Sequence, residues 1–100
     1  MRITGRHVLD ECWRLHPDTR SWIQNWLADA ERSEWNTPAD VRSSYASASF
    51  LAGGVVVFNV KGNAYRLETE VAYHFSIIAV IWMGTHAAYD VRNRKRRRRS

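Results

Sequence analysis

The chain has 100 residues, carries a formal net charge of +5 and is 45% hydrophobic, with five tryptophans among its aromatic residues. This length suits one domain and leaves no room for a second, and the apolar content excludes a globally disordered chain. The longest uninterrupted apolar stretch, from Ile77 to Met83, is far shorter than the roughly 20 residues that a membrane-spanning helix needs.

Neither an export signal nor a metal site is indicated. The first seven residues lack the sustained apolar segment of a signal peptide. Cys12 is the only cysteine, which excludes an internal disulfide and fits a reducing compartment. His7, His16 and His74 do not have the spacing of clustered metal ligands. We therefore expect a cytoplasmic protein that uses no metal or other cofactor and does not associate with a membrane.

The first half of the chain predicts helices. Apolar residues recur at helical spacing from Thr4 to Leu15 and, after Pro17, from Asp18 to Arg32. Thr37-Pro38-Ala39-Asp40 combines a cap hydroxyl, a first-turn proline and a carboxylate, so a short helix is predicted as far as Tyr45. The tryptophans at helical spacing are interpreted as packing residues: Trp13, Trp22 and Trp26.

The second half changes to the two-residue period of strands. Val55–Val60 is rich in β-branched residues, a turn follows, and Ala64–Tyr73 and Ser76–Met83 continue as strands. These segments predict a three-stranded antiparallel meander. The expected fold is α/β of the α+β type, with the N-terminal helices packed on a small antiparallel sheet. Because the last strand is apolar throughout, we expect both of its faces to be covered.

The middle strand has two different faces. Tyr65, Leu67, Thr69, Val71 and Tyr73 share one face, which we assign to the core. Arg66, Glu68 and Glu70 share the other face, which we expect to meet solvent or substrate.

Residues 58–67 and 84–90 place polar side chains at strand ends and turns, where they can converge on a substrate. RNA is cut without a metal when its 2′-hydroxyl attacks the adjacent phosphate. This reaction needs a base, an acid for the leaving 5′-oxygen and cations that stabilise the charge on phosphorus. His86 is the proton-transfer candidate because imidazole ordinarily titrates at about pH 6.5. If Thr85 caps a short C-terminal helix, the helix dipole favours a neutral His86 and hence the base role.

The other catalytic candidates surround His86. Arg66 can present two parallel donors to a phosphate, so it is the candidate electrostatic stabiliser. Lys61, in the turn, is a candidate phosphate anchor or acid. Asp90 follows His86 by one helical turn and can orient His86 or Arg66, and Tyr89 can stack on a base or donate a proton.

Each candidate also has a structural interpretation. Exposed lysines and arginines are usually solvated, and Arg66 could simply pair with Glu68 and Glu70 across the strands. His86 could only cap or pack. Asn63 is first of all a turn residue that tolerates positive φ, with Gly62 as its partner.

Charge is unevenly distributed along the chain. All ten acidic residues lie at or before Asp90, whereas seven of the fifteen basic residues follow it. The tail, residues 92–100, has no apolar anchor and its like charges repel, so we expect it to be disordered without a partner and assign the domain to residues 1–91. The tail is either a solvated extension or an arm that adds salt-sensitive affinity for RNA. The RNA-binding candidates are Lys61, Asn63, Arg66, Arg92, Arg94 and Lys95.

Residues 35–41, 57–67 and 84–90 together resemble the HigB-type toxins of the RelE/ParE superfamily. The resemblance spans residues 1–91 in one order and leaves out only the tail. It implies a RelE-like fold and a small bacterial toxin of a type II toxin–antitoxin pair. It further implies an endoribonuclease (mRNA interferase) that acts usually on the translating ribosome, and neutralisation by a HigA-type helix-turn-helix antitoxin in a hetero-oligomer.

Some positions depart from the family pattern. Family members usually carry apolar residues where this chain has Glu68 and Glu70, so two negative charges lie on the face expected to meet a polyanion. Position 88 is commonly glutamate in the family but is Ala88 here, so no carboxylate completes a capping box with Thr85. We hypothesise that the arginine tail compensates the acidic sheet face.

Two other functions stay open at this point. ParE-type members of the same superfamily poison DNA gyrase without an acid–base site. Alternatively, a non-enzymatic basic module would bind RNA through its tail alone and would not arrest growth. A nuclease should lose its toxicity when His86 and Arg66 are replaced, whereas a gyrase poison of the ParE type should keep it. A non-enzymatic RNA-binding module should not be toxic at all.

Overall fold

The chain folds into helices and one sheet, which the computed structural model describes for the backbone of residues 1–99 and the side chains of residues 1–96. Within this range the helices are α1 (Arg6–Leu15), α2 (Arg20–Arg32), α3 (Pro38–Ser44) and α4 (His86–Arg99), and the 3-10 turns are η1 (Pro17–Thr19), η2 (Ala52–Gly54) and η3 (Tyr73–Phe75). The strands are β1 (Arg2–Thr4), β2 (Ser49–Phe50), β3 (Val55–Val60), β4 (Tyr65–Ala72) and β5 (Ile77–Thr85). The predicted α+β class is confirmed.

The sheet is mixed rather than purely antiparallel. Its strand order in residues 1–99 is β1-β5-β4-β3-β2, with the predicted meander β3-β4-β5 at its centre. β1 runs parallel to the start of β5, and β2 runs antiparallel to β3. The prediction of three strands was wrong because strands of two or three residues are too short to show an alternating pattern.

The first helix begins later than its periodicity predicts. Arg2–Thr4 is extended in β1, and the chain turns into α1 at Gly5, whose φ is 77°. A Cβ at Gly5 would collide with the carbonyl oxygen of Val80, so glycine is required where the chain crosses β5. The predicted start of α3 is confirmed, since Thr37 and Asp40 form a capping box.

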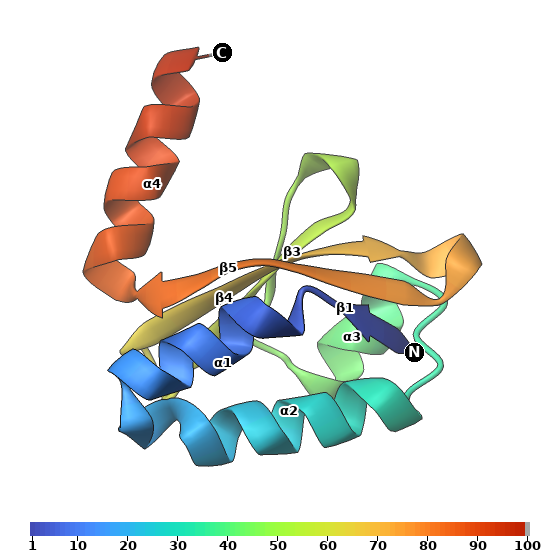
Figure 1. Ribbon diagram of the computed structural model, residues 1–100. Helices are drawn as coiled ribbons and strands as arrows, with labels where there is room; N and C mark the ends of the chain where they lie inside the picture. The colour runs from blue at the N-terminus through green and yellow to red at the C-terminus, as the bar shows by residue number, and fades with distance from the viewer. Residues whose placement is uncertain (100) are drawn as a thin grey trace.

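The core lies between the sheet and the N-terminal helices. Figure 1 shows α1 and α2 against one face of the sheet. Trp26 of α2 is fully buried and meets Phe58 of β3 edge to face, with ring centroids 5.5 Å apart. Trp13 and Trp22 are partly buried against this core, so the interpretation of the helical tryptophans as packing residues is confirmed. Leu15, expected on the core face, is 69% exposed because it is the last residue of α1.

The two faces of β4 follow the predicted alternation with one exception. Tyr65, Leu67, Thr69 and Val71 are buried on the helix side, and Thr69 Oγ1 donates to the carbonyl of Val56 (2.9 Å). Glu70 is exposed on the other face. Glu68 was expected to be accessible there as well, but it is only 4% exposed because arginines from α4 lie over it.

β5 is buried on one face and only partly covered on the other, where Ile77, Ala79 and Trp82 are of intermediate exposure, whereas cover on both faces was predicted. Ile78, Val80 and Met83 are buried toward the helices. The register passes from the pair Glu68–Trp82 to the pair Thr69–Val80, so Ile81 is the extra residue of a β-bulge. Ile81 is 37% exposed, which makes the bulge the least covered part of this strand's apolar run.

Helix α4 leaves the end of β5 on the side of the sheet opposite α1 and α2 (Figure 1). The predicted cap is confirmed, since Thr85 Oγ1 accepts a hydrogen bond from the backbone N–H of Ala88 (3.1 Å). α4 continues to Arg99, whereas we expected disorder from residue 92 onward. Ser100 lies outside the described residues, and the domain boundary at residue 91 stays a prediction. No helix within residues 1–99 is long and apolar enough to cross a membrane.

Candidate active site

Two distant segments meet at one end of the sheet: the turn between β3 and β4, residues 61–64, and the junction between β5 and α4. In the β4–β5 register, Tyr65 pairs with Thr85 and Arg66 with Gly84. The backbone N–H of His86 donates to the carbonyl oxygen of Ala64 (3.0 Å), which extends the pairing one step beyond the strands. The backbone of Arg66 therefore lies beside the chain that leads directly into His86.

The turn holds the guanidinium of Arg66. Its Nη2 donates to Oδ1 of Asn63 (3.1 Å), and its Nη1 donates to the carbonyl of Tyr65 (3.1 Å) and, at 3.4 Å, to that of Asn63. These bonds use three of the five N–H donors of a guanidinium, so donors remain for a phosphate. The positive φ values in this turn belong to Lys61 (52°) and Gly62 (68°), not to Asn63 as expected. Asn63 acts instead through its side chain, as a support for Arg66.

His86 is the first residue of α4 and is paired within that helix. Its Nε2 lies 3.3 Å from Oδ2 of Asp90, one helical turn further on, as the spacing predicts. Both side chains are about half exposed. A carboxylate at Nε2 favours the tautomer with its proton on that nitrogen, which leaves Nδ1 as the acceptor of a neutral imidazole.

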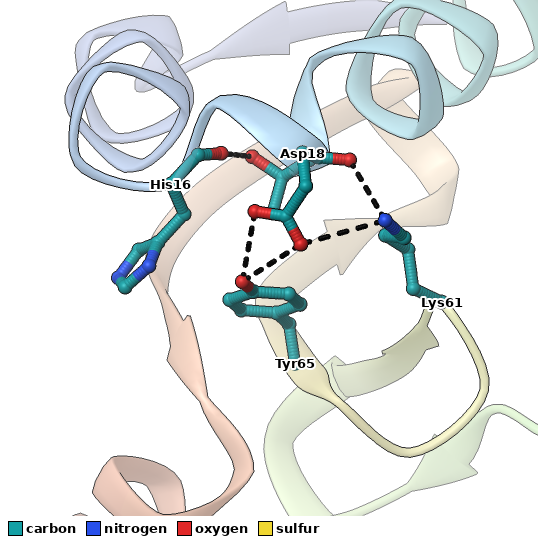
Figure 2. Close-up of polar contacts among 5 residues, drawn as sticks. His16, Asp18, Lys61 and Tyr65 are labelled. Carbon is teal, nitrogen blue, oxygen red and sulfur yellow. Dashed lines mark hydrogen bonds and ion pairs between the residues drawn. The ribbon is translucent and has the colours of Figure 1, made fainter.

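Lys61 has a partner that the sequence did not indicate. Its Nζ lies 3.2 Å from the carbonyl oxygen of Asp18 and 3.4 Å from Oδ2 of the same residue, in η1. The hydroxyl of Tyr65 donates to both carboxylate oxygens of Asp18 (3.0 Å each), so Asp18 bridges Lys61 and Tyr65 (Figure 2). The ring of His16 lies edge-on to that of Tyr65, with centroids 5.2 Å apart. These contacts tie the β3–β4 turn to η1 on the helix side of the sheet.

The Asp18 bridge also shifts the pKa values of Asp18 and Tyr65. The hydrogen bond from Tyr65 is the main cause that lowers the pKa of Asp18 below its ordinary value, and Lys61 adds to it. Burial and the neighbouring Asp18 together raise the pKa of Tyr65. At neutral pH the carboxylate of Asp18 is therefore ionised and the phenol of Tyr65 is neutral.

Glu68 joins the sheet to α4. Arg92 donates to it through Nε (3.2 Å) and Nη2 (3.3 Å), and Arg96 donates through Nη2 (2.7 Å). Burial by itself would raise the pKa of Glu68, but the hydrogen bonds and charges of Arg92 and Arg96 outweigh it and hold the pKa below its ordinary value. The guanidinium of Arg92 also lies 5.7 Å from the ring centroid of Trp82, the neighbour of Glu68 in the register.

Tyr89 adds to the contact between α4 and the sheet. Its ring lies 5.9 Å from that of Trp82, between centroids. Beside them, an open groove of about 620 Å³ separates α4 from β5. Its lining residues are Trp82, Ala88, Val91, Arg92, Lys95 and Arg96.

The predicted residues therefore fall into separate groups. Arg66 and Asn63 are in contact, and so are His86 and Asp90, at neighbouring points of one sheet end. Lys61 is engaged on the helix side, Tyr89 packs on Trp82, and Arg92 is bound to Glu68, while Arg94 and Lys95 are exposed.

Two partners, Asp18 and Glu68, were missed as contacts. Asp18 lies 43 residues from Lys61 in the chain, and Glu68 lies 24 residues from Arg92. No local pattern signals pairs so far apart. The one available hint was Glu68 itself, an acidic residue where the resemblance led us to expect an apolar one.

One comparison with known proteins identifies a family. Residues 19–92 match the family described as "HigB_toxin, RelE-like toxic component of a toxin-antitoxin system". This match runs from the end of η1, through the sheet, to Arg92 of α4, and so includes both segments of the candidate site. The comparison with curated proteins gives no match. Because the family match covers well over half of the chain, this protein belongs to the HigB toxin family, whose members are RelE-like toxic components of toxin–antitoxin systems.

Proposed function

We propose that this toxin is a metal-independent endoribonuclease that cleaves messenger RNA on the translating ribosome. The proposal rests on the β4–β5 register, which sets Arg66 beside Gly84, two residues before His86. A guanidinium and an imidazole at one sheet end are the two groups that phosphodiester cleavage by an internal hydroxyl needs most.

The reaction follows from these two groups. Nδ1 of His86 accepts the proton of a ribose 2′-hydroxyl, and the resulting oxygen attacks the adjacent phosphorus. The bond from phosphorus to the 5′-oxygen breaks, which leaves a 2′,3′-cyclic phosphate on one fragment and a 5′-hydroxyl on the other. Arg66 donates its remaining N–H groups to the phosphate oxygens, where negative charge grows in the transition state.

The supporting residues have graded roles in this proposal. Asp90 orients His86, and Asn63 orients Arg66. Tyr89 or Lys61 supplies the proton for the leaving 5′-oxygen, and binding RNA would draw Lys61 from its ion pair with Asp18. Arg94 and Lys95, exposed on α4, bind flanking phosphates, whereas Arg92 is engaged with Glu68.

Family membership supports one partner, an antitoxin, and the other partners are part of the proposal. A toxin of a toxin–antitoxin system has an antitoxin, and we propose that it is a HigA-type helix-turn-helix protein that forms a hetero-oligomer with this chain. The proposed substrate complex is messenger RNA bound to the ribosome.

Primer extension on RNA from cells that express the toxin tests the proposal. The wild type should produce new 5′ ends within messages, and His86→Gln and Arg66→Gln should each reduce them by about 100-fold or more. His74→Gln is the matched control, since His74 is exposed at the opposite end of the β4–β5 hairpin. Circular dichroism checks that each variant is folded.

Two results would contradict the proposal. Growth arrest without RNA cleavage, retained by both variants, would indicate a gyrase poison of the ParE type. Absence of growth arrest with the wild type would indicate a non-enzymatic RNA-binding module.

A further inference from the structure

Helix α4 is fastened to the sheet by a carboxylate, and this contact is unusually deep for a charged group. Glu68 is 4% exposed and accepts three hydrogen bonds from Arg92 and Arg96. Loss of a buried, fully hydrogen-bonded carboxylate costs stability, because the guanidinium groups that donate to it lose all of these hydrogen bonds at once.

Little else holds this part of α4. Its first turn is capped by Thr85 and packs Tyr89 on Trp82. Val91 is 42% exposed. Among the side chains that the structure describes beyond Val91, the polar and aromatic contacts of α4 with the sheet are the two arginines on Glu68 and the approach of Arg92 to Trp82. Beyond Val91, the described part of α4 is therefore held to the sheet mainly through one acidic side chain.

We propose that Glu68 is a positioning residue: it anchors α4 to the sheet and thereby keeps His86 and Asp90, in the first turn of that helix, aligned with Arg66. The catalytic part of this inference rests on the proposed function. The anchoring part concerns the fold alone and can be measured without RNA.

Glu70 provides a matched comparison. It lies two residues from Glu68 on the same face of β4, but it is exposed. Replacing either glutamate by glutamine removes one negative charge from the face expected to meet RNA, so each change alone should tighten RNA binding slightly. Only Glu68→Gln also weakens the hold of Arg92 and Arg96. Anchoring and simple charge repulsion therefore predict different results for the two variants.

The first measurement is amide hydrogen exchange, residue by residue, in wild type, Glu68→Gln and Glu70→Gln. Glu68→Gln should speed exchange of the α4 amides by about tenfold or more relative to the sheet amides, because charge-assisted bonds to a buried acceptor are lost. Glu70→Gln should leave the α4 amides unchanged. Equal exchange rates in the two variants would overturn the anchoring role.

The second measurement is cleavage of ribosome-bound messenger RNA, with kcat and KM separated. Glu68→Gln should lower kcat about tenfold while KM stays equal or falls, since a loosened α4 misaligns His86 but binds a polyanion no worse. Glu70→Gln should keep kcat and lower KM slightly. Faster exchange in α4 with an unchanged kcat would overturn the positioning role while leaving the nuclease proposal intact.

The two proposals can fail separately. If wild-type toxin does not cut the message, the nuclease proposal and the catalytic role of Glu68 are both overturned. The exchange difference between Glu68→Gln and Glu70→Gln still decides whether Glu68 anchors the helix.

Discussion

His86 and Arg66 are each held by a neighbour within four residues in the chain, whereas Lys61 is held by Asp18, 43 residues away. The local pairs set the proposed chemistry: Asp90 favours the tautomer of His86 that accepts a proton at Nδ1, and Asn63 fixes the plane of the Arg66 guanidinium. The distant pair sets the frame, because it ties the turn that precedes Arg66 to η1.

Asp90→Asn should reduce RNA cleavage by at most about fivefold. The ion pair of Asp90 with His86 is half exposed, and such pairs contribute about 1 kcal/mol or less, which corresponds to that factor in rate. Single-turnover cleavage of ribosome-bound message measures the effect, with His86→Gln as the reference for full loss. A defect as large as that of His86→Gln would mean that Asp90 itself takes part in proton transfer.

The site was predictable to the extent that its contacts are local. The pair His86–Asp90 and the cap at Thr85 follow from helical spacing, and both are confirmed as contacts. The partners of Lys61 and Glu68 depend on which elements pack together, and packing of distant elements leaves no periodic signal in one sequence. For the same reason the prediction that this face of β4 is accessible is wrong at Glu68 alone, where Arg92 and Arg96 of α4 cover the side chain.

Among the elements, α3 and α4 begin with caps of different completeness. In α3, Thr37 accepts from the backbone N–H of Asp40 and Asp40 bonds back to that of Thr37, whereas in α4 only the Thr85 half of the motif can form because residue 88 is alanine. The long strands were predicted within one or two residues because their alternation is clear. The strands β1 and β2 were missed because tertiary pairing, rather than local pattern, defines them.

Thr37→Ala should destabilise the protein by about 1 kcal/mol, since it removes the side-chain acceptor at the start of α3. Urea unfolding followed by tryptophan fluorescence measures the loss. Thr37→Ser keeps the hydroxyl and should retain most of the stability. An alanine variant as stable as the serine variant would show that the cap adds nothing in this context.

Docking of α4 should weaken in acid. The pKa of Glu68 is lowered in the folded protein, so its contribution is fully present above its ordinary value of 4.5 and is lost as the pH falls through the lowered folded value. The cross-strand neighbours of Glu68, Val57 and Trp82, carry no charge.

Protection factors of the α4 amides, measured from about pH 7 to about pH 3, report the loss of α4 docking. Wild-type protection should fall at the acid end of the range, below the ordinary titration of a glutamate. Glu68→Gln should show low protection with no such fall. A wild-type curve that is flat down to global acid unfolding would contradict the assignment to Glu68.

At the scale of the whole molecule, an acidic body carries a basic end. The net charge of +5 arises from the seven cations after Asp90, and α4 presents this charge from the side of the sheet opposite α1 and α2 (Figure 1). Glu68 pairs with both Arg92 and Arg96 but offsets only one of their two charges, so α4 keeps a net positive charge that can attract a polyanion.

The double variant Arg94→Gln/Lys95→Gln should reduce the salt dependence of RNA binding. Each lost phosphate contact lowers the slope of log K against log salt by about 0.7 for single strands, so a change of about 1.4 is expected. Fluorescence anisotropy with a labelled oligoribonucleotide over a salt series measures the slope. Arg14→Gln, which removes an exposed charge from α1, is the control. The same slope in the double variant and in the control would exclude Arg94 and Lys95 as phosphate contacts.

The contact between Glu68 and its two arginines also limits the order in which evolution could exchange it for an apolar one. The side chain of Glu68 is 5% exposed, while the side chains of Arg92 and Arg96 are 35% and 40% exposed. If the strand residue changes first, the partly exposed arginines can turn into water. If the helix residues change first, the carboxylate loses all three hydrogen bonds that compensate its burial. Lineages that interconvert the two kinds of interface should therefore substitute the strand before the helix, and ancestral intermediates that carry the glutamate without either arginine should be rare.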